Sequence, residues 1–251
     1  MPSSVTTPRG DGAQAASSYL INGVVCIDAG SIGLSADVDA QGRIEAVFLS
    51  HSHLDHIASL PMFLDNVYRL APRPPTLYAG PETLDALASK VFTRETWMTL
   101  DSMRSIDPPF VRVEVLEPWK QVDAAGLRIT PIPVNHVIPT FGFLIEEPGS
   151  AILFSADTGP TEAFWDVANR IETLRAVFIE ASFPNAMESV AIASGHLTPA
   201  LLVAELRKLR RDAPIVAVHL KPRHAAVVAE ELRALGLASL RVGMPGMELS
   251  F

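Results

Sequence analysis

The sequence predicts a mixed α/β fold on three observations. Short apolar runs rich in β-branched residues are separated by turn residues, which is the pattern of buried strands. In the later part of the chain these runs alternate with segments whose apolar residues recur at helical spacing. The 251 residues are enough for one large domain or two small ones with a sizeable core. We therefore expect sheet inside and helices outside.

The expected elements follow from these patterns. Strands are predicted first at residues 19–21, 24–28 and 44–49, and a helix is predicted to extend from the segment after residue 56 to Leu70. Later strands are predicted at residues 76–79, 110–115, 127–134, 142–146, 151–155, 176–180, 215–219 and 240–242. Further helices are predicted at residues 82–92, 160–170, 198–211 and 224–235.

Residues 1–16 are predicted to be a flexible N-terminal tail, because they are rich in Ser, Thr, Gly and Pro. Residues 17–251 are predicted to form a single domain. Within it, proline-rich segments at 72–75 and 107–109 bracket residues 80–106, which we expect to form a cap. An aromatic side chain there could stack on a nucleobase, but at this spacing hydrophobic packing is the favoured interpretation for Phe92, Trp97, Met98 and Met103.

Charge and cysteine content exclude several classes of protein. The chain has 20 Lys and Arg against 28 Asp and Glu, so its net charge of −8 repels polyanions and a nucleic-acid coat protein is not expected. The single cysteine, Cys26, excludes an internal disulfide and a four-cysteine metal site, and we expect it in the core. The sequence has no secretory signal and no apolar run of about 18–20 residues. We therefore expect a cytoplasmic protein without membrane association.

A cluster of metal-binding residue types follows the predicted strand 44–49. It contains His51, His53, Asp55 and His56 within six positions. In an extended segment the first two histidines project to the same side, and the turn into the helix brings the other two residues beside them. Imidazole and carboxylate donors without thiolates suit zinc, with iron or manganese as alternatives. The two pairs of donors predict two divalent metal ions.

One loop cannot complete two coordination spheres, so further donors are expected at later strand ends. His136, Asp157 and His219 each follow a predicted strand. Taken singly, each could instead be a hydrogen-bonded histidine or a helix-capping aspartate. His224 is the alternative to His219, which we prefer because it closes an apolar strand whereas His224 lies at a predicted helix start.

The segment His51-Ser52-His53-Leu54-Asp55-His56 matches H-x-H-x-D-H and resembles the metallo-β-lactamase superfamily, from about Ser18 to Phe251. The resemblance implies a four-layer αβ/βα sandwich with its site along one edge of the two sheets. It implies that one metal is held by His51, His53 and His136 and the other by Asp55, His56 and His219. It also implies that Asp157 bridges both metals and that Asp55 and Asp157 are catalytic residues.

A second motif selects among the hydrolases of this superfamily. Glu180 follows a predicted strand, and His196 lies in the turn Gly195-His196-Leu197-Thr198. This combination resembles the phosphodiesterase branch and, in particular, class II 3′,5′-cyclic-nucleotide phosphodiesterases. A phosphodiesterase needs an activated water, charge neutralisation and a proton for the leaving oxygen, and His196 oriented by Glu180 could supply that proton. The alternative for His196 is a structural role beside the start of the helix at Thr198.

Other polar residues are predicted to assist this site. We expect His196, Thr198, Lys221 and Arg223 to contact the phosphate of the substrate, although Lys221 and Arg223 could instead form a solvated basic turn. Asp28 and Ser31 are expected to support the metal ligands by hydrogen bonding, with turn formation as the alternative.

The predicted function is hydrolysis of cyclic AMP or cyclic GMP to the 5′-monophosphate by a hydroxide that bridges two metals. The expected partner is a small-molecule phosphodiester, and the chain could form a homodimer. The alternatives are a tRNA 3′-processing endonuclease, a lactonase or thioesterase of the same superfamily, and a non-catalytic module that retains the metals. The net charge of −8 and the lack of a long basic arm argue against the tRNA enzyme.

Overall fold

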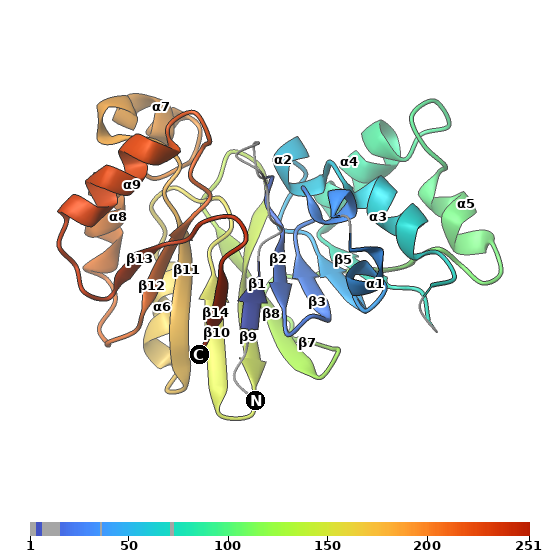
Figure 1. The fold of residues 1–251 in the computed structure, drawn as a ribbon, viewed down its shortest axis with the longest axis horizontal. Coiled ribbons are helices and arrows are strands. Elements are labelled where there is room, and N and C mark those ends of the chain that lie inside the picture. Colours follow the sequence, from blue (N-terminus) through green and yellow to red (C-terminus); the bar gives the residue numbers. More distant parts are fainter. Residues whose placement is uncertain (1–3, 7–15, 36, 71–72) are drawn as a thin grey trace. The chain divides into compact units, whose positions relative to one another are not determined.

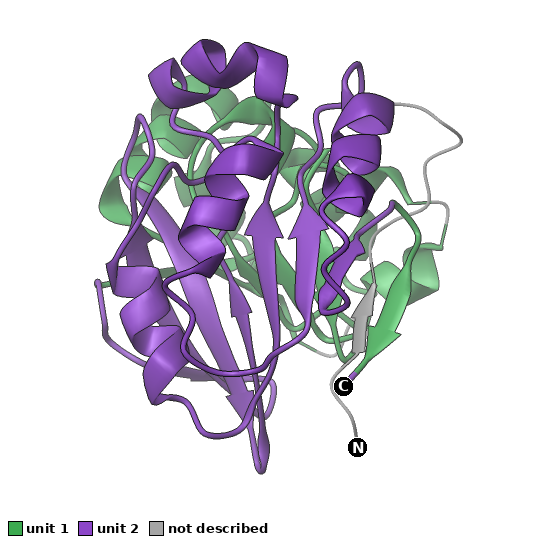
Figure 2. Cartoon of the chain, turned by 90° about the vertical axis from the view of Figure 1, so that its left-hand side faces the viewer, with its two compact units in different colours: residues 1, 3–117, 245–250 green, residues 2, 118–244, 251 purple. Residues whose placement is uncertain are grey.

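The structure is a computed structural model that describes residues 4–6, 16–35, 37–70 and 73–251. These residues form two compact units, coloured separately in Figure 2. The first unit contains the described residues up to Glu117 together with 245–250, and the second contains 118–244 with Phe251. Each unit has one seven-stranded sheet among its described residues, with helices of its own (Figure 1). The predicted α/β class is confirmed.

The sheet of the first unit has the strand order β14-β1-β2-β3-β4-β5-β6. In that order the strands are Glu248–Ser250, Ser4–Thr6, Tyr19–Ile21, Val25–Ile27, Ala46–Phe48, Thr76–Ala79 and Arg112–Val115. Strands β14 to β3 pair antiparallel, and strands β3 to β6 pair parallel. The β2–β3 hairpin turns at Asn22 and Gly23, both at positive φ, and its loop has three residues because Ile21 pairs with Val25.

The sheet of the second unit has the order β13-β12-β11-β10-β9-β8-β7. In that order the strands are Leu240–Val242, Ile215–Val218, Leu174–Glu180, Ser150–Phe154, Thr140–Glu147, Leu127–Val134 and Val122–Ala124. Strands β7 to β10 pair antiparallel, and strands β10 to β13 pair parallel. Within each sheet, the carboxyl ends of the parallel strands therefore lie at one edge of that sheet. Loops at this edge can bring side chains of the same unit together.

The helices of the first unit are short. They are α1 (Val38–Gln41), α2 (Leu54–Ile57), α3 (Leu60–Val67), α4 (Pro81–Ala86) and α5 (Leu100–Ser105), with the single turns η1 (Ile32–Leu34) and η2 (Leu87–Val91). The helix predicted between residue 56 and Leu70 is α3, which ends at Val67, and the short α2 precedes it as a separate helix. Pro61 lies in the first turn of α3, where its missing N–H costs nothing, so a new helix begins at Leu60 instead of continuing α2.

The second unit contains α6 (Ala163–Arg170), α7 (Glu188–Ala193), α8 (Pro199–Leu206) and α9 (Ala225–Ala234), with the turn η3 (Asn185–Met187). Helix α8 begins as the sequence indicates. The Thr198 hydroxyl accepts the backbone N–H of Leu201, and Pro199 occupies the first helical position. Helix α7, which was not predicted, is a six-residue helix whose apolar residues Val190 and Ile192 are exposed, so it lacks a clear helical pattern.

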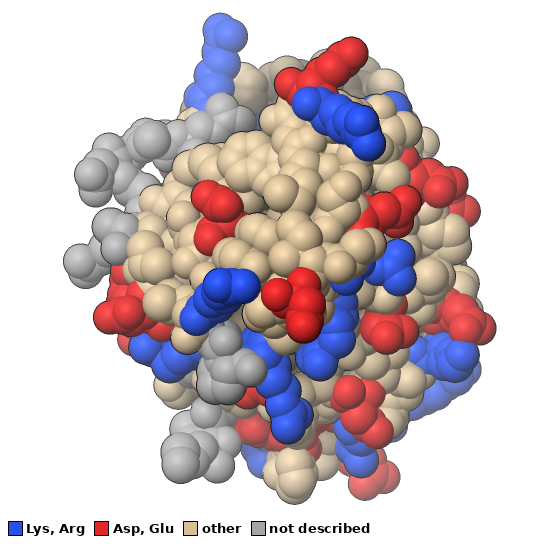
Figure 3. All heavy atoms as spheres, turned by 90° about the vertical axis from the view of Figure 1, so that its right-hand side faces the viewer, with Lys and Arg blue, Asp and Glu red and all other residues tan. Residues whose placement is uncertain are grey.

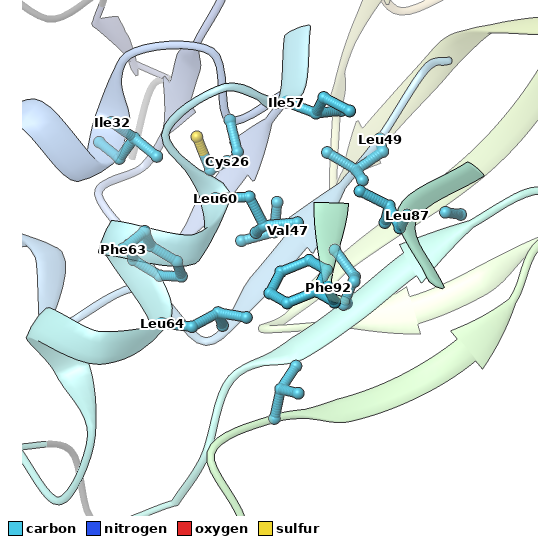
Figure 4. Close-up of a cluster of buried hydrophobic side chains, with 14 of the residues drawn as sticks. Cys26, Ile32, Val47, Leu49, Ile57, Leu60, Phe63, Leu64, Leu87 and Phe92 are labelled. Atoms are coloured by element: carbon cyan, nitrogen blue, oxygen red, sulfur yellow. The ribbon is translucent and has the colours of Figure 1, made fainter. Parts of the chain in front are cut away.

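Each unit has its own hydrophobic core. In the first unit, buried side chains of β3 to β5 pack against α3, η2 and α5, and Figure 4 shows ten of these residues labelled, Cys26 and Phe92 among them. In the second unit, the strands from β8 to β12 pack against Phe164 and Trp165 of α6 and against α8 and α9. Cys26, Phe92 and Met103 are buried, as predicted, and Trp97 packs against the same core, but Met98 is 41% exposed. Burial raises the pKa of the Cys26 thiol above its ordinary range.

Two expectations about organisation stay predictions. In the predicted tail, residues 4–6 form β1, and residues 1–3 and 7–15 lie outside the described residues. The cap predicted at 80–106 contains α4, η2 and α5, but its relation to a substrate is untested. Within the described ranges, no helix is both long and apolar enough to cross a membrane.

Glu205 of α8 joins two helices of the second unit, and its loss should destabilise that unit. Its buried carboxylate accepts the N–H of Thr161 at 3.0 Å and the indole N–H of Trp165 at 2.8 Å. In Glu205→Ala both buried donors lose their acceptor, at about 1–3 kcal/mol each. We expect urea denaturation to show a free energy of unfolding lower by about 2–6 kcal/mol. The exposed helical Glu230→Ala should change it by less than about 0.5 kcal/mol, and equal effects would contradict the assignment.

Candidate metal and catalytic site

The histidine motif of the first unit begins after β4 and extends into α2, which contains Asp55 and His56. His51 and His56 are buried, whereas His53, at the start of α2, and Asp55 are partly exposed. Backbone hydrogen bonds hold this turn, since the Ala29 N–H donates to the His56 carbonyl at 2.7 Å. Gly30 packs against the same turn so closely that a Cβ there would lie 2.0 Å from the carbonyl oxygen of Asp55. The turn that carries the motif is therefore tightly placed.

Asp28, directly after β3, orients this motif. One oxygen accepts the Ser50 N–H at 2.8 Å, and the other lies 2.9 Å from the Ser50 hydroxyl and 2.7 Å from Nδ1 of His56. Because Asp28 engages Nδ1, the His56 ring directs Nε2 away from it as a potential metal donor. The hydrogen bonding expected of Asp28 is thus present, and its support of a metal ligand stays a prediction. Ser31 does not share this hydrogen bonding, because its hydroxyl donates to the Ala16 carbonyl at 2.8 Å.

In the second unit three of the predicted site residues lie at the ends of neighbouring parallel strands, whereas His136 follows β8, which pairs antiparallel with β9. Asp157 follows β10, Glu180 ends β11 and His219 follows β12, so the register of the sheet brings them to the same edge. Nδ1 of His219 lies 3.3 Å from Oδ1 of Asp157, and Nε2 of His196 lies 3.9 Å from Oδ2. Donor atoms of Asp157, His196 and His219 all lie within 4.8 Å of one another.

Glu180 is fully buried and surrounded by hydrogen-bond donors. Its Oε1 accepts the Thr158 N–H at 3.0 Å and lies 2.6 Å from Nδ1 of His196. Its Oε2 accepts the N–H groups of Ser182 at 3.1 Å and Leu197 at 3.2 Å. These four bonds compensate the cost of burying a carboxylate. The predicted pairing of Glu180 with His196 is therefore present in the structure.

His196 is held between two acidic groups. Burial lowers the pKa of its imidazole, but the charge and hydrogen bond of Glu180, together with the charge of Asp157, outweigh burial and raise the pKa above its ordinary value. The raised pKa favours the protonated ring. With Nδ1 bonded to Glu180, the protonated ring carries its other hydrogen on Nε2, toward Asp157. This geometry suits a proton donor.

His136 is oriented by a backbone carbonyl. Its Nδ1 lies 2.8 Å from the carbonyl oxygen of Gly195, which leaves Nε2 as the donor atom for a metal. Burial lowers the pKa of His136, so the neutral ring that a metal requires is favoured. Gly195 has φ +67°, and a Cβ on it would lie 2.9 Å from Nδ1 of His136. The glycine thus permits the close approach that positions this histidine.

Replacing Gly195 by alanine is therefore expected to displace His136 and weaken metal binding. We expect chelator competition to show about a tenfold loss of affinity, the lower end of the effect of changing groups that orient ligands. Gly236→Ala is the matched control, because Gly236 also has a positive φ, +64°, but no atom lies within 4 Å of the Cβ position. Both variants should lose about 1–2 kcal/mol from the left-handed backbone. Equal metal affinity in the two variants would contradict the positioning role of Gly195.

The predicted substrate contacts divide into two kinds. Thr198 is fully buried and its hydroxyl caps α8, and its predicted contact with the phosphate stays a prediction. Lys221 is partly exposed and Arg223 is exposed, in the turn between β12 and α9. His224, the alternative ligand, lies at the start of α9 with its ring 6.2 Å from that of Phe183 and belongs to no metal-binding group among the described residues.

Two serines beside these histidines were missed by the sequence analysis. Ser50 lies 2.9 Å from Nδ1 of His51, and Ser182 lies 3.0 Å from Nδ1 of His219. Both lie just beyond the end of a parallel strand, the position that identified the histidines, but serine is too common in turns to have been selected there. In both units, imidazole and carboxylate donors suited to a divalent metal gather at strand ends, and this donor set fits zinc, iron or manganese.

Comparison with known families identifies the class of protein. Residues 33–234 match the family described as the beta-lactamase superfamily domain. This match covers most of the chain, and the chain belongs to that family. The resemblance to metallo-β-lactamase superfamily hydrolases inferred from the histidine motif is confirmed.

Individual proteins resemble the chain more specifically. It is 27% identical over 224 residues to a Yersinia pestis protein named "Probable 3′,5′-cyclic-nucleotide phosphodiesterase", covering 80% of this chain and 63% of that protein. The chain spans less than two thirds of the length of the curated relatives it matches. Its fold is similar to that of unliganded yeast PDE1, with a TM-score of 0.80, 17% identity and coverage of 100% of this chain and 99% of the other. The short form of human tRNase Z has a TM-score of 0.69 at 20% identity, with 98% of each chain covered.

Proposed function

We propose that this chain is a metal-dependent phosphodiesterase that hydrolyses 3′,5′-cyclic nucleotides to 5′-monophosphates. The observation that carries the proposal is the hydrogen-bonded pair of Glu180 and His196 beside Asp157. Hydrolysis of a phosphodiester needs a proton for a poor leaving group, and this pair is built to hold and deliver one. The name of the Yersinia pestis relative supports the same substrate class.

The proposed metal ligands are those that the family resemblance implies. One metal would be held by His51, His53 and His136, the other by Asp55, His56 and His219, with Asp157 shared between them. Two divalent cations, when bound, neutralise charge on the phosphoryl oxygens and make a water molecule more acidic. We propose zinc as the metal, in accordance with the imidazole and carboxylate donors.

The residues of the chain would complete the reaction. The bond between phosphorus and the 3′-oxygen breaks as the oxygen of a water molecule, which releases one proton to the solvent, bonds to phosphorus. The 3′-oxygen must gain a proton. Nε2 of His196 delivers this proton, while Glu180 holds the opposite side of the ring. Lys221 and Arg223 follow the proposed ligand His219 closely in sequence, and their positive charges would attract the charged phosphate.

The test is turnover of 3′,5′-cyclic AMP by the zinc-loaded chain, with the product identified by chromatography. Formation of 5′-AMP is expected. Cleavage of bis(p-nitrophenyl) phosphate alone would support the metal site and refute the cyclic-nucleotide assignment. If neither compound is cleaved by a chain that binds metal, lactone and thioester substrates become the alternatives.

A tRNA 3′-processing activity is the second candidate, because the fold is similar to that of human tRNase Z. The charge distribution is less favourable to it. The net charge is −8, and on the face seen in Figure 3 Lys and Arg side chains are interspersed with Asp and Glu. Nucleic-acid binding depends on clustered positive charge. Cleavage of a precursor tRNA at its 3′ end, without formation of 5′-AMP from cyclic AMP, would favour this alternative.

A further inference from the structure

The two units repeat one hydrogen-bonding pattern around a buried serine. In each unit a buried carboxylate accepts the backbone N–H of the serine and engages Nδ1 of one histidine, and the serine Oγ lies near Nδ1 of two histidines. The carboxylate, serine and histidines are Asp28, Ser50, His56 and His51 in the first unit, and Glu180, Ser182, His196 and His219 in the second. The same hydrogen-bonding pattern thus occurs twice, in segments whose local sequences are unrelated.

The hydrogens can be assigned in the first unit. The Ser50 hydroxyl has one hydrogen, and it donates to Oδ2 of Asp28 at 2.9 Å, because a carboxylate only accepts. The Ser50 Oγ also lies 2.9 Å from Nδ1 of His51, and with its hydrogen engaged it can only accept there. Nδ1 of His51 therefore carries a hydrogen, and the lone pair of the neutral ring is on Nε2.

In the second unit the histidine beside the serine also carries its hydrogen on Nδ1, but the serine hydroxyl donates to a different acceptor. The Ser182 hydroxyl donates to the backbone carbonyl of His219 at 3.1 Å, and its Oγ lies 3.0 Å from Nδ1 of the same residue. Ser182 therefore accepts from Nδ1–H of His219. Oδ1 of Asp157, 3.3 Å from that nitrogen, is a second acceptor for the same hydrogen. His219 also has φ +59°, so its carbonyl bond to Ser182 holds a backbone conformation that is uncommon for histidine.

We propose that Ser50 and Ser182 are positioning residues that fix the tautomer and orientation of His51 and His219, so that each ring presents Nε2 as a metal donor. The proposal rests on the proposed metal site. Both serines are buried, and backbone bonds fix Ser182, whose N–H donates to the Leu197 carbonyl at 3.0 Å. A hydroxyl held in this way restricts ring rotation before any metal arrives.

The direct test is the ring ¹⁵N–¹H correlation spectrum of the whole, chelator-treated chain labelled at histidine. In the wild type we expect His51 and His219 in the Nδ1–H form. In Ser182→Ala, His219 should become a mixture of both tautomers while His196 is unchanged, because Glu180 still holds it. In Ser50→Ala, His51 should change and His56 should not. A hydrogen on Nε2 of either ring in the wild type, or no tautomer change in the variants, would overturn the proposal.

Zinc affinity, measured by competition with a chromophoric chelator, is the second readout. Each serine variant should bind about 10–100-fold more weakly than the wild type. Ser59→Ala is the matched control, since Ser59 is equally buried but bonds only to backbone, donating to Ala29 and accepting from Gly33. Unchanged affinity in Ser50→Ala and Ser182→Ala, or an equal loss in the control, would refute the positioning role.

These readouts separate the inference from the proposed function. If the wild type binds zinc with the expected tautomers but cleaves no cyclic nucleotide, the phosphodiesterase assignment fails and the role of the serines stands. If the tautomers are not as expected, the inference fails whatever the activity. The wild-type spectrum decides this even if a variant does not fold.

Discussion

Replacing Asp157 by alanine should reduce cyclic-nucleotide turnover at least about a thousandfold, equivalent to about 4 kcal/mol of transition-state stabilisation. Asp157 is 1% exposed and lies among the histidines of the second unit, 3.3 Å from His219 and 3.9 Å from His196. If it is shared by two metals, its loss removes a negatively charged donor from both. The measurement is turnover of cyclic AMP together with metal content by elemental analysis, and both are expected to fall.

Two further variants make the Asp157 result interpretable. Asp157→Asn keeps the shape of the side chain but not its charge, so it should resemble the alanine variant if charge and coordination are what matter. Asp166→Ala removes an exposed aspartate from α6 and should leave turnover and metal content unchanged. Wild-type turnover by Asp157→Ala would exclude the proposed site. Loss of stability with turnover absent even in the wild type would favour a non-catalytic metal-binding module.

The second large effect is expected at His196. We predict that His196→Ala lowers turnover of cyclic AMP by about 10²–10⁴-fold, the usual contribution of general acid catalysis. Metal content should be retained, because the family resemblance assigns His196 no metal. The loss should be much smaller with bis(p-nitrophenyl) phosphate, since p-nitrophenolate departs without needing a proton.

This comparison of substrates distinguishes the possible roles of His196. Equal losses with both phosphodiesters would contradict proton donation. Loss of metal would show that His196 acts as a ligand, which its distance of 3.9 Å from Asp157 also allows. Glu180→Gln should lower turnover too, but it should also destabilise the fold. The amide nitrogen of glutamine cannot accept from the N–H groups that now surround the carboxylate, and an unsatisfied buried donor costs about 1–3 kcal/mol.

Much of the fold could be read from local patterns. The strand predicted at 127–134 is β8 with the same bounds, and those predicted at 76–79 and 240–242 are β5 and β13. Each is rich in apolar or β-branched residues, which favours a strand even where a charged residue or a proline interrupts the run, as in β8 and β13. The three-residue strands β7 and β14 were not predicted. Both are short and partly exposed, so their amino-acid composition does not indicate a strand. They are strands because β7 pairs with β8 and β14 pairs with β1.

The sequence by itself determined which residues are candidates for chemistry, because dense histidine spacing and strand-end positions are local properties. Only the tertiary structure decided how those side chains are held. Asp28 meets His56 across 28 positions, Gly195 meets His136 across 59, and Ser182 meets His219 across 37. Such contacts depend on strand order, register and backbone conformations such as the positive φ of His219, which are set by the packing of the whole unit. A residue such as Ser182 has no local signal, since its role exists only through the rings that the fold places beside it.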